Sequence, residues 1–263
     1  MMVRILTALV LTPIAVGAIV WSGALLFIIV LVCAILTAQE IFLMLSKKGH
    51  KPLILPAYFM IALILFSAFS YHTTEFWGGF AIRSLVLFGL FFALGELFFE
   101  KIWVSKNDFL MTTKVVLFVA CSYSFFYLIR GLPEGLEILL FSCAIVWCGD
   151  IGALVLGKFW GKRKLVPKIS PKKTIEGAIG GTVTSVVIGL GFAFVLHKPL
   201  LMMGALSVLL SVVGQLGDLH ESLFKRSFGV KDSSNLLPGH GGMYDRADSS
   251  LFVMPLAYYL FLG

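Results

Sequence analysis

Long apolar stretches, separated by short polar segments, dominate this sequence of 263 residues. A helix needs about 20 mainly apolar residues to cross the hydrocarbon core of a membrane. About nine stretches suit such a helix, at residues 4–20, 24–45, 53–70, 77–99, 109–129, 136–157, 175–196, 200–217 and 244–262. The pattern therefore predicts an all-α, polytopic integral membrane protein with polar loops between its transmembrane helices.

The composition agrees with this pattern. Hydrophobic residues make up 59% of the chain and charged residues 13%, whereas roughly a quarter of a typical soluble domain is charged. No soluble domain or internal repeat is recognisable, so a single membrane domain is expected over residues 1–263. Within it, residues 1–135 hold the N-terminal spans, and residues 136–263 hold the later spans with the two longest polar loops.

Basic residues are distributed unevenly between the two sides of the predicted helices. Most lie at the N-terminus and in the loops after the second, fourth, sixth and eighth spans, while the opposite side holds only Arg130 and Lys198. Cytoplasmic loops carry the excess of Lys and Arg, so the N-terminus and both polar loops are predicted to be cytoplasmic and the C-terminus to lie on the other side of the inner (cytoplasmic) membrane. The same loops account for the net charge of +7, and nucleic acid is therefore not expected as a partner.

A few charged residues fall within the predicted spans. Glu40, Arg83 and Lys114 lie near span ends, where interfacial pairing or snorkelling toward the surface is the ordinary explanation. Asp150 lies late in a span that ends beside the basic loop. An ionisable group at that depth is a candidate for function.

The loop after the sixth span is strongly basic and leads into an apolar helix. The sequence SPKKT at residues 170–174 precedes the stretch that begins at Ile175. Thr174 is a predicted N-cap, so the backbone N–H groups and the positive end of the helix would meet Lys172 and Lys173, which suits a phosphate. The alternative is a solvated basic loop that attracts anionic lipid headgroups.

The second polar loop supplies acidic residues. Asp218 and Glu221 are three residues apart, as are Asp245 and Asp248, so on helices each pair would share a face. These carboxylates either pair with neighbouring basic residues or bind Mg²⁺, which prefers carboxylate and phosphate oxygens. His240, in a glycine-rich turn, is a candidate base, phosphate donor or turn-stabilising group. Carboxylates, cations and glycines at a cytoplasmic membrane boundary together predict a phosphoryl or nucleotidyl transferase with a lipid co-substrate.

Residues 222–248 carry a long motif. They read S-x-F-K-R, four residues, K-D-x-S, two residues, and L-P-x-H-G-G-M-x-D-R-A-D. This motif closely resembles the signature of the phosphatidate cytidylyltransferases, also called CDP-diacylglycerol synthases. The resemblance extends to GDLHES at 217–222, SPKKTIEG at 170–177 and DIGALVLGK at 150–158, and so covers the C-terminal half of the chain. Ala247 departs from the family, which usually has a larger residue there.

The resemblance implies a reaction and a set of site residues. CTP and phosphatidic acid would give CDP-diacylglycerol and pyrophosphate in an all-helical membrane protein, commonly a homodimer, with Mg²⁺ and, as a second candidate, a monovalent cation such as K⁺. Metal-site carboxylates are implied at Asp218, Asp245 and Asp248, supported by Asp150 and Glu221. Catalytic roles are implied for Asp245 and Asp248 and for Lys225 and Arg226, which would neutralise phosphates. Substrate-binding roles are assigned to Ser170, Lys172, Lys173, Thr174, Ser222, Lys231, His240, Gly241, Gly242 and Arg246.

Two other classes of protein share parts of this pattern. A related CTP-using enzyme, such as a polyprenol or dolichol kinase or a CDP-archaeol synthase, would keep a site of cations and carboxylates but accept another lipid. A transporter of a phosphorylated solute also places charges at membrane depth and glycines within its spans. A transporter needs a polar route across the bilayer, however, whereas the polar residues here gather on one side.

Overall fold

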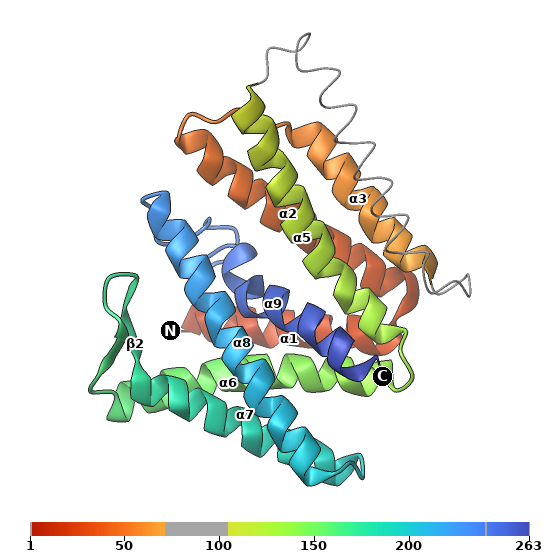
Figure 1. The fold of residues 1–263 in the computed structure, drawn as a ribbon, viewed down its shortest axis with the longest axis vertical. Coiled ribbons are helices and arrows are strands. Elements are labelled where there is room, and N and C mark those ends of the chain that lie inside the picture. Colours follow the sequence, from red (N-terminus) through yellow and green to blue (C-terminus); the bar gives the residue numbers. More distant parts are fainter. Residues whose placement is uncertain (1, 72–104, 240, 263) are drawn as a thin grey trace. The chain divides into compact units, whose positions relative to one another are not determined.

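The computed structural model describes residues 2–71, 105–239 and 241–262. Helices dominate this part of the chain (Figure 1). Those long and apolar enough to cross a membrane are α2 (Gly23–Lys47), α5 (Lys106–Arg130), α6 (Gly135–Trp160), α7 (Ile175–Val195) and α8 (Leu200–Ser227). The other helices are α1 (Met2–Trp21), α3 (Ile54–Tyr71) and α9 (Tyr244–Phe261). A helical, multi-pass membrane protein is therefore confirmed, and the count of nine spans stays a prediction because the fourth, at 77–99, lies outside the described residues.

One element departs from the prediction of helices joined by loops. The basic loop after α6 contains an antiparallel hairpin of β1 (Lys164–Val166) and β2 (Ser170–Thr174), in which Lys164 pairs with Thr174 and Val166 with Ser170. The strands are too short and too polar to produce an alternating pattern in the sequence. The predicted all-α class holds, and this short hairpin is the one sheet within the described residues.

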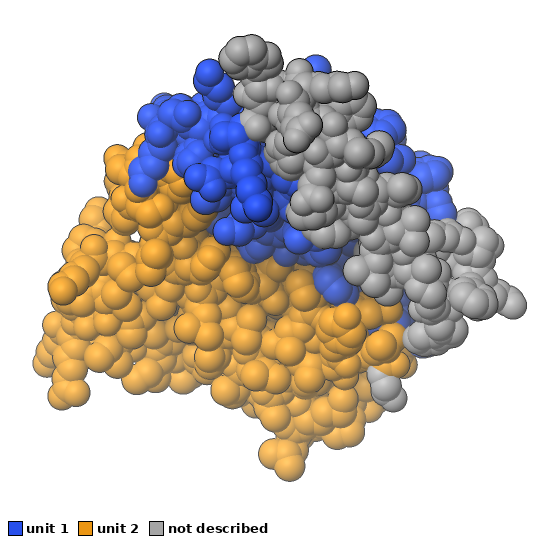
Figure 2. All heavy atoms as spheres, turned by 45° about the horizontal axis from the view of Figure 1, so that its top comes forward, with its two compact units in different colours: residues 1–133, 232–246 blue, residues 134–231, 247–263 orange. Residues whose placement is uncertain are grey.

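The chain divides into two compact units, which Figure 2 colours separately. Unit 1 comprises residues 1–133 and 232–246, and unit 2 comprises residues 134–231 and 247–263. The single membrane domain predicted over residues 1–263, with its division at residue 135, stays a prediction. The segment 232–246, however, belongs with the N-terminal helices, although it follows α8 in the chain.

Unit 1 is built on the packing of α2, α3 and α5. Their facing sides bury large apolar side chains, including Phe42 and Phe109, each 1% exposed. A buried hydrogen bond of 2.9 Å between the hydroxyl groups of Thr37 and Tyr123 links α2 to α5. Between helices in a membrane, such side chains stabilise the contact mainly through close van der Waals packing, because lipid tails are as apolar as they are.

Unit 2 depends on close helix contacts made at glycines. The helices α6 and α7 lie side by side (Figure 1), and a Cβ atom at Gly181 would lie 2.9 Å from the backbone oxygen of Gly149. Small residues at such positions let helix backbones approach closely, which is a common way for transmembrane helices to pack. The predicted N-cap of α7 is confirmed, because the Thr174 hydroxyl accepts a 3.1 Å hydrogen bond from Gly177 N.

Candidate active site

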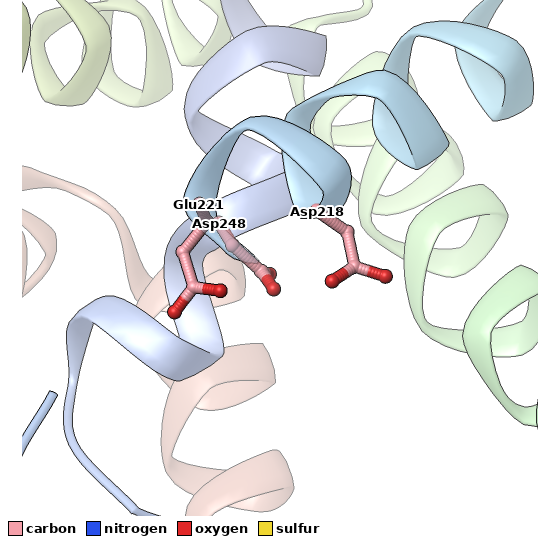
Figure 3. A group of neighbouring side chains, drawn as sticks. All are labelled: Asp218, Glu221 and Asp248. Carbon is pink, nitrogen blue, oxygen red and sulfur yellow. The ribbon is translucent and has the colours of Figure 1, made fainter. Parts of the chain in front are cut away.

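Three carboxylates of unit 2 form the centre of the candidate site. Asp218 and Glu221 lie on α8, which continues as a helix ten residues beyond the apolar stretch predicted to end at residue 217, and Asp248 lies on α9. One oxygen of each carboxylate lies within 4.8 Å of the other two. Figure 3 shows the three side chains turned toward a common space. Asp218 and Glu221 therefore share a helix face, as their spacing predicts.

Gly217 permits the close approach of α8 and α9 at this point. A Cβ atom at Gly217 would lie 2.8 Å from the ring of Phe252 and 3.0 Å from the backbone oxygen of Asp248. Any larger residue would force the two helices apart, since real Cβ atoms are not found so close to other heavy atoms. The glycine that precedes Asp218 thus sets the spacing between Asp218 and Asp248.

Two lysines are paired with these carboxylates. Lys173 Nζ lies 2.7 Å from Asp218 Oδ2, and Lys225 Nζ lies 2.6 Å from Glu221 Oε1, one turn away on α8. The second pair is the more buried, with side chains that are 10% exposed in Lys225 and 2% in Glu221. A buried carboxylate needs a counter-ion or a full set of hydrogen bonds, because an isolated charge is strongly unfavourable away from water. Lys225 supplies the counter-ion for Glu221.

The hairpin that carries Lys173 is held in place by two charged side chains. At its base, the Glu176 carboxylate accepts hydrogen bonds from Lys162 N at 3.0 Å and Arg163 N at 3.1 Å. At its turn, Arg226 donates from Nε to the backbone oxygen of Ile169 at 3.3 Å. The hairpin is therefore tied to α7 at one end and to the end of α8 at the other, which fixes the strand on which Lys173 lies.

Arg226 was predicted to neutralise phosphates, but in this structure its guanidinium binds backbone oxygens of the protein. Besides Ile169, its guanidinium donates from Nη1 to the backbone oxygen of Val230 at 2.9 Å. Its planar group of several donors suits two acceptors in fixed directions. Arg226 thus organises the backbone around the site, and its predicted contact with phosphate stays a prediction.

Asp245 lies in unit 1 and is not one of the three grouped carboxylates. Its Oδ2 atom accepts hydrogen bonds from Gly242 N at 2.8 Å and from Ser233 N at 3.0 Å. The side chain is buried, at 7% exposed. Asp245 closes the loop between residues 233 and 242, and its predicted role as a metal ligand stays a prediction.

Asp150, the acidic residue predicted to support the metal site, is exposed on α6. It lines a small cavity of unit 2 together with Gly149, Gln215 and Ser249. It does not belong to the group of three carboxylates. Its supporting role therefore also stays a prediction.

The remaining predicted residues are placed around the hairpin and the loop. Lys172, Lys231 and Arg246 are exposed, and Ser170 and Ser222 are partly exposed. His240 lies outside the described residues. In the same turn Gly241 has a φ of +82°, a conformation that glycine adopts without strain. A Cβ atom at the buried Gly242 would collide with the side chains of Ser233 and Glu40.

Glu40 lies in a setting that the sequence did not predict. An acidic residue near the end of an apolar stretch was expected to pair at the membrane interface, but Glu40 is 3% exposed and its carboxylate lies within the loop of residues 233–244. That expectation is wrong, because backbone and hydroxyl groups of the loop, rather than water or a lipid headgroup, surround the charge. The only signal in the sequence was the charge itself.

The donor set of the site suits a divalent cation that prefers oxygen. Mg²⁺ takes oxygen ligands at about 2.0–2.1 Å, so opposite ligands of one ion are about 4.2 Å apart. The carboxylate oxygens of Asp218, Glu221 and Asp248, all within 4.8 Å of one another, need only small side-chain adjustments to reach that spacing. With Lys173 and Lys225 beside them, the site can bind both a cation and an anion such as a phosphate.

Comparison with known proteins gives a consistent result along the whole chain. The model of the cytidylyltransferase family matches residues 2–262. The phosphatidate cytidylyltransferase of Bacillus subtilis is 37% identical over 229 residues, which cover 84% of this chain and 83% of that protein. Phosphatidate cytidylyltransferases of Staphylococcus haemolyticus and Staphylococcus aureus are 34% identical over 258 residues and 36% identical over 259 residues, and each alignment covers 97% of both proteins.

Proposed function

This chain belongs to the cytidylyltransferase family, and from that premise we propose that it transfers the cytidylyl group of CTP to phosphatidic acid, as a phosphatidate cytidylyltransferase. The products are CDP-diacylglycerol and pyrophosphate, so the protein acts in phospholipid biosynthesis. The observation that best supports this function is the group formed by Asp218, Glu221 and Asp248, with Lys173 and Lys225 as ion-pair partners. Two phosphate-bearing substrates need positive charge from lysines and a bound cation, and the cation in turn needs carboxylate ligands.

The reaction does not require the enzyme to remove a proton from the attacking group. The attacking group is a phosphate oxygen of phosphatidic acid, which is ionised at neutral pH, so no protein nucleophile or strong general base is required. In one in-line step, a bond forms between that oxygen and the α-phosphorus of CTP while the bond from the α-phosphorus to the oxygen of the leaving pyrophosphate breaks. The protein's task is to bring two anions together and to stabilise the charge that develops on the leaving group.

Asp218, Glu221 and Asp248 are the residues that would hold Mg²⁺. When bound there, Mg²⁺ would supply positive charge to the phosphate oxygens of CTP and so favour both attack and departure. A role for Asp245 as a further ligand, for Asp150 as a supporting residue and for K⁺ as a second ion completes this part of the proposal.

Lysines of the hairpin and of α8 orient the phosphates. Lys173 and Lys225 are ion-paired with carboxylates of the site, so each ammonium group lies next to the proposed position of the triphosphate. Lys172 is exposed on the same hairpin strand and would guide the nucleotide toward the site by long-range attraction. Because a lysine ammonium has three donors, it can bind a carboxylate and a phosphate together.

Other residues of the motif would complete the substrate sites. Ser170, Thr174 and Ser222 lie on or next to the elements that carry Lys173 and Lys225. The exposed Lys231 and Arg246 flank the loop with Gly241 and Gly242. We assign these residues, with His240 and Arg226, to binding of the nucleotide and the lipid phosphate.

We also propose how the protein is arranged in the membrane. Nine transmembrane helices, with the N-terminus and both polar loops in the cytoplasm and the C-terminus on the opposite side, would place the site at the cytoplasmic surface of the inner (cytoplasmic) membrane. The excess of Lys and Arg in these loops supports this orientation. There the site meets CTP from the cytoplasm and phosphatidic acid from the adjacent leaflet. The enzyme is further proposed to be a homodimer.

The test is an acceptor comparison with purified protein in detergent. CTP labelled with ³²P at the α-phosphorus, or in parallel at the γ-phosphorus, is supplied with Mg²⁺ and with phosphatidic acid, a polyprenol or an archaeal diether phosphate, and one reaction omits Mg²⁺. The expected result is metal-dependent α label in CDP-diacylglycerol, with the γ label released in pyrophosphate. Transfer of the γ label to polyprenol alone would identify a lipid kinase, and transfer of the α label to the diether phosphate alone a CDP-archaeol synthase. Folded protein that leaves CTP unchanged with every acceptor would contradict the proposal and favour a transporter.

A further inference from the structure

Glu40 makes an unusually complete set of hydrogen bonds for a side chain on an apolar helix. Its Oε1 atom accepts from Ser234 Oγ at 2.7 Å and from Met243 N at 2.8 Å. Its Oε2 atom accepts from Ser233 Oγ at 2.7 Å and from Tyr244 N at 2.9 Å. Each oxygen therefore has one hydroxyl and one backbone donor, which accounts for a charged group that is 3% exposed on α2.

These donors come from both ends of one loop, residues 233–244, hereafter the signature loop. Ser233 and Ser234 begin the loop, and Met243 and Tyr244 end it. Asp245 makes a second connection between the same two ends, through Ser233 N and Gly242 N. Glu40 and Asp245 thus close the base of the loop from two directions.

Only a glycine fits at position 242 in this arrangement. A Cβ atom at this position would collide with Glu40 Oε2 and Ser233 Oγ. The glycine of the motif therefore leaves room for the carboxylate of α2 to reach the loop. This is a separate observation that connects a motif residue to Glu40 rather than to a substrate.

Glu40 also acts on the start of α9. That helix begins at Tyr244, and the first N–H groups of a helix have no partner within the helix. The Glu40 carboxylate supplies an acceptor to Tyr244 N and, one residue earlier, to Met243 N, and its negative charge suits the positive end of the helix. Asp248, one of the three grouped carboxylates, follows Tyr244 by one turn on the same helix.

We propose that Glu40 is a positioning residue for the reaction. It holds the signature loop closed and fixes where α9 begins, and it acts through the start of this helix on Asp248, which lies one turn further along it. This inference rests on the proposed function, since it concerns the same site. Glu40 touches neither substrate nor metal in this role, and it acts through the backbone of the loop.

A glutamine at position 40 tests this role without removing side-chain volume. Each carboxylate oxygen accepts from one backbone N–H, Met243 N or Tyr244 N. A glutamine has one oxygen and one NH₂ group, so in either orientation one of these N–H groups faces another donor. The hydroxyl groups of Ser233 and Ser234 can rotate to accept, but a backbone N–H cannot.

The matched control is Asp108→Asn. Asp108 is another buried carboxylate of unit 1, 8% exposed at the start of α5, and its Oδ1 lies 2.9 Å from His50 Nδ1. Its carboxylate contacts the side chains of His50 and Ser105 and the backbone of Lys51, all of which lie outside the signature loop. Both substitutions neutralise one buried carboxylate, so a general loss of stability should be similar in the two variants. Only Glu40→Gln should act on the loop.

The experiment combines amide hydrogen exchange with steady-state kinetics on the full-length protein. In Glu40→Gln, exchange of peptides that cover residues 241–248 should rise at least about tenfold, because one N–H loses its acceptor. The Mg²⁺ concentration for half-maximal activity should rise about tenfold or more, and kcat should fall. Asp108→Asn should leave both the exchange of these peptides and the Mg²⁺ requirement within about twofold of wild type. Should Glu40→Gln fail to fold, the Ser233→Ala/Ser234→Ala variant, which keeps the carboxylate, should shift both quantities in the same direction.

Two results would overturn the inference. One is unchanged exchange and an unchanged Mg²⁺ requirement in the Glu40 or double-serine variant. The other is an equal loss of activity in Glu40→Gln and Asp108→Asn with no change in Mg²⁺ requirement, which would indicate only a loss of stability. If wild-type protein makes no CDP-diacylglycerol, the proposed function fails and the positioning role fails with it, while the exchange data still decide whether Glu40 anchors the loop.

Discussion

Lys173 on β2 and Asp218 on α8 form an ion pair whose Nζ and Oδ2 atoms are 2.7 Å apart. The hairpin thus contributes a cation directly to the group of carboxylates at the candidate site. This contact joins the segments SPKKTIEG at 170–177 and GDLHES at 217–222, which are separated by about forty residues in the sequence. Its consequences for substrate binding can be measured.

Replacement of Lys173 by methionine should weaken use of CTP. The variant loses a charge next to the proposed triphosphate position and leaves Asp218 without this partner. A hydrogen bond to a charged group contributes about 1.5–3 kcal/mol, so kcat/KM for CTP should fall by about tenfold to a hundredfold. Lys168→Met, an exposed residue between the strands of the same hairpin, should change kcat/KM by less than about twofold. Similar losses in the two variants would show that only the net charge of the hairpin matters.

Asp248→Asn should abolish metal-dependent turnover in a folded protein. We expect kcat to fall by at least about a hundredfold, the range seen when one electrostatic group of a site is removed. Mg²⁺ should raise the melting temperature of the wild-type protein, because a ligand that binds the native state stabilises it, and this rise should be lost in the variant. Glu137→Gln, which changes an acidic residue in the first turn of α6, is the control. Near-normal activity in Asp248→Asn would remove Asp248 from the metal site.

The sequence predicts those features of the site that depend on local spacing. Asp218 and Glu221, three residues apart, lie on one helix face because α8 continues past its apolar part. Thr174 caps α7 because it is a hydroxyl residue placed directly before an apolar helical stretch. Both outcomes follow from the geometry of a single helix, which a sequence encodes directly.

Features that depend on distant contacts are not visible in the sequence. The hairpin has strands of three and five residues, and it is held by Glu176 and Arg226 rather than by an apolar strand pattern. The residues that donate hydrogen bonds to Glu40 lie more than 190 residues after it in the sequence. The sequence near Glu40 therefore cannot distinguish a carboxylate at the membrane interface from one buried against a loop. Such contacts require the relative placement of elements, which hydrophobic periodicity does not determine.

The stereochemistry at the α-phosphorus tests the single-step mechanism. If phosphatidic acid attacks CTP directly, one in-line displacement should invert the configuration at that phosphorus. The measurement uses CTP made chiral at the α-phosphorus with sulfur in place of one oxygen, followed by configurational analysis of the CDP-diacylglycerol product. Retention would indicate two displacements and hence an enzyme-bound cytidylyl intermediate, and would contradict the mechanism.

Arg226→Lys should loosen the hairpin although it keeps the charge. Arg226 donates to the backbone oxygens of Ile169 and Val230 at 3.3 and 2.9 Å, and a lysine ammonium cannot reproduce this planar arrangement. We expect hydrogen exchange over residues 164–174 to rise severalfold and kcat/KM for CTP to fall by about tenfold, since each lost hydrogen bond weakens the hairpin by about 1 kcal/mol. Arg163→Lys, an exposed position at the start of the hairpin, should show neither effect. Unchanged exchange in Arg226→Lys would indicate that Glu176 alone holds the hairpin.

The contact between α6 and α7 should be sensitive to a single methyl group. A Cβ atom at Gly181 would lie 2.9 Å from the backbone oxygen of Gly149 and 3.0 Å from the Cβ atom of Ala153. Gly181→Ala should therefore separate the helices and lower the free energy of unfolding by about 1–3 kcal/mol, as overpacking does. Gly191, on the same helix, has no atom of another helix within 4 Å of its Cβ position, so Gly191→Ala should be neutral or stabilise by up to about 1 kcal/mol through helix propensity. Thermal unfolding of both variants in the same detergent measures the difference, and equal melting temperatures would show that α6 and α7 do not depend on backbone contact at Gly181.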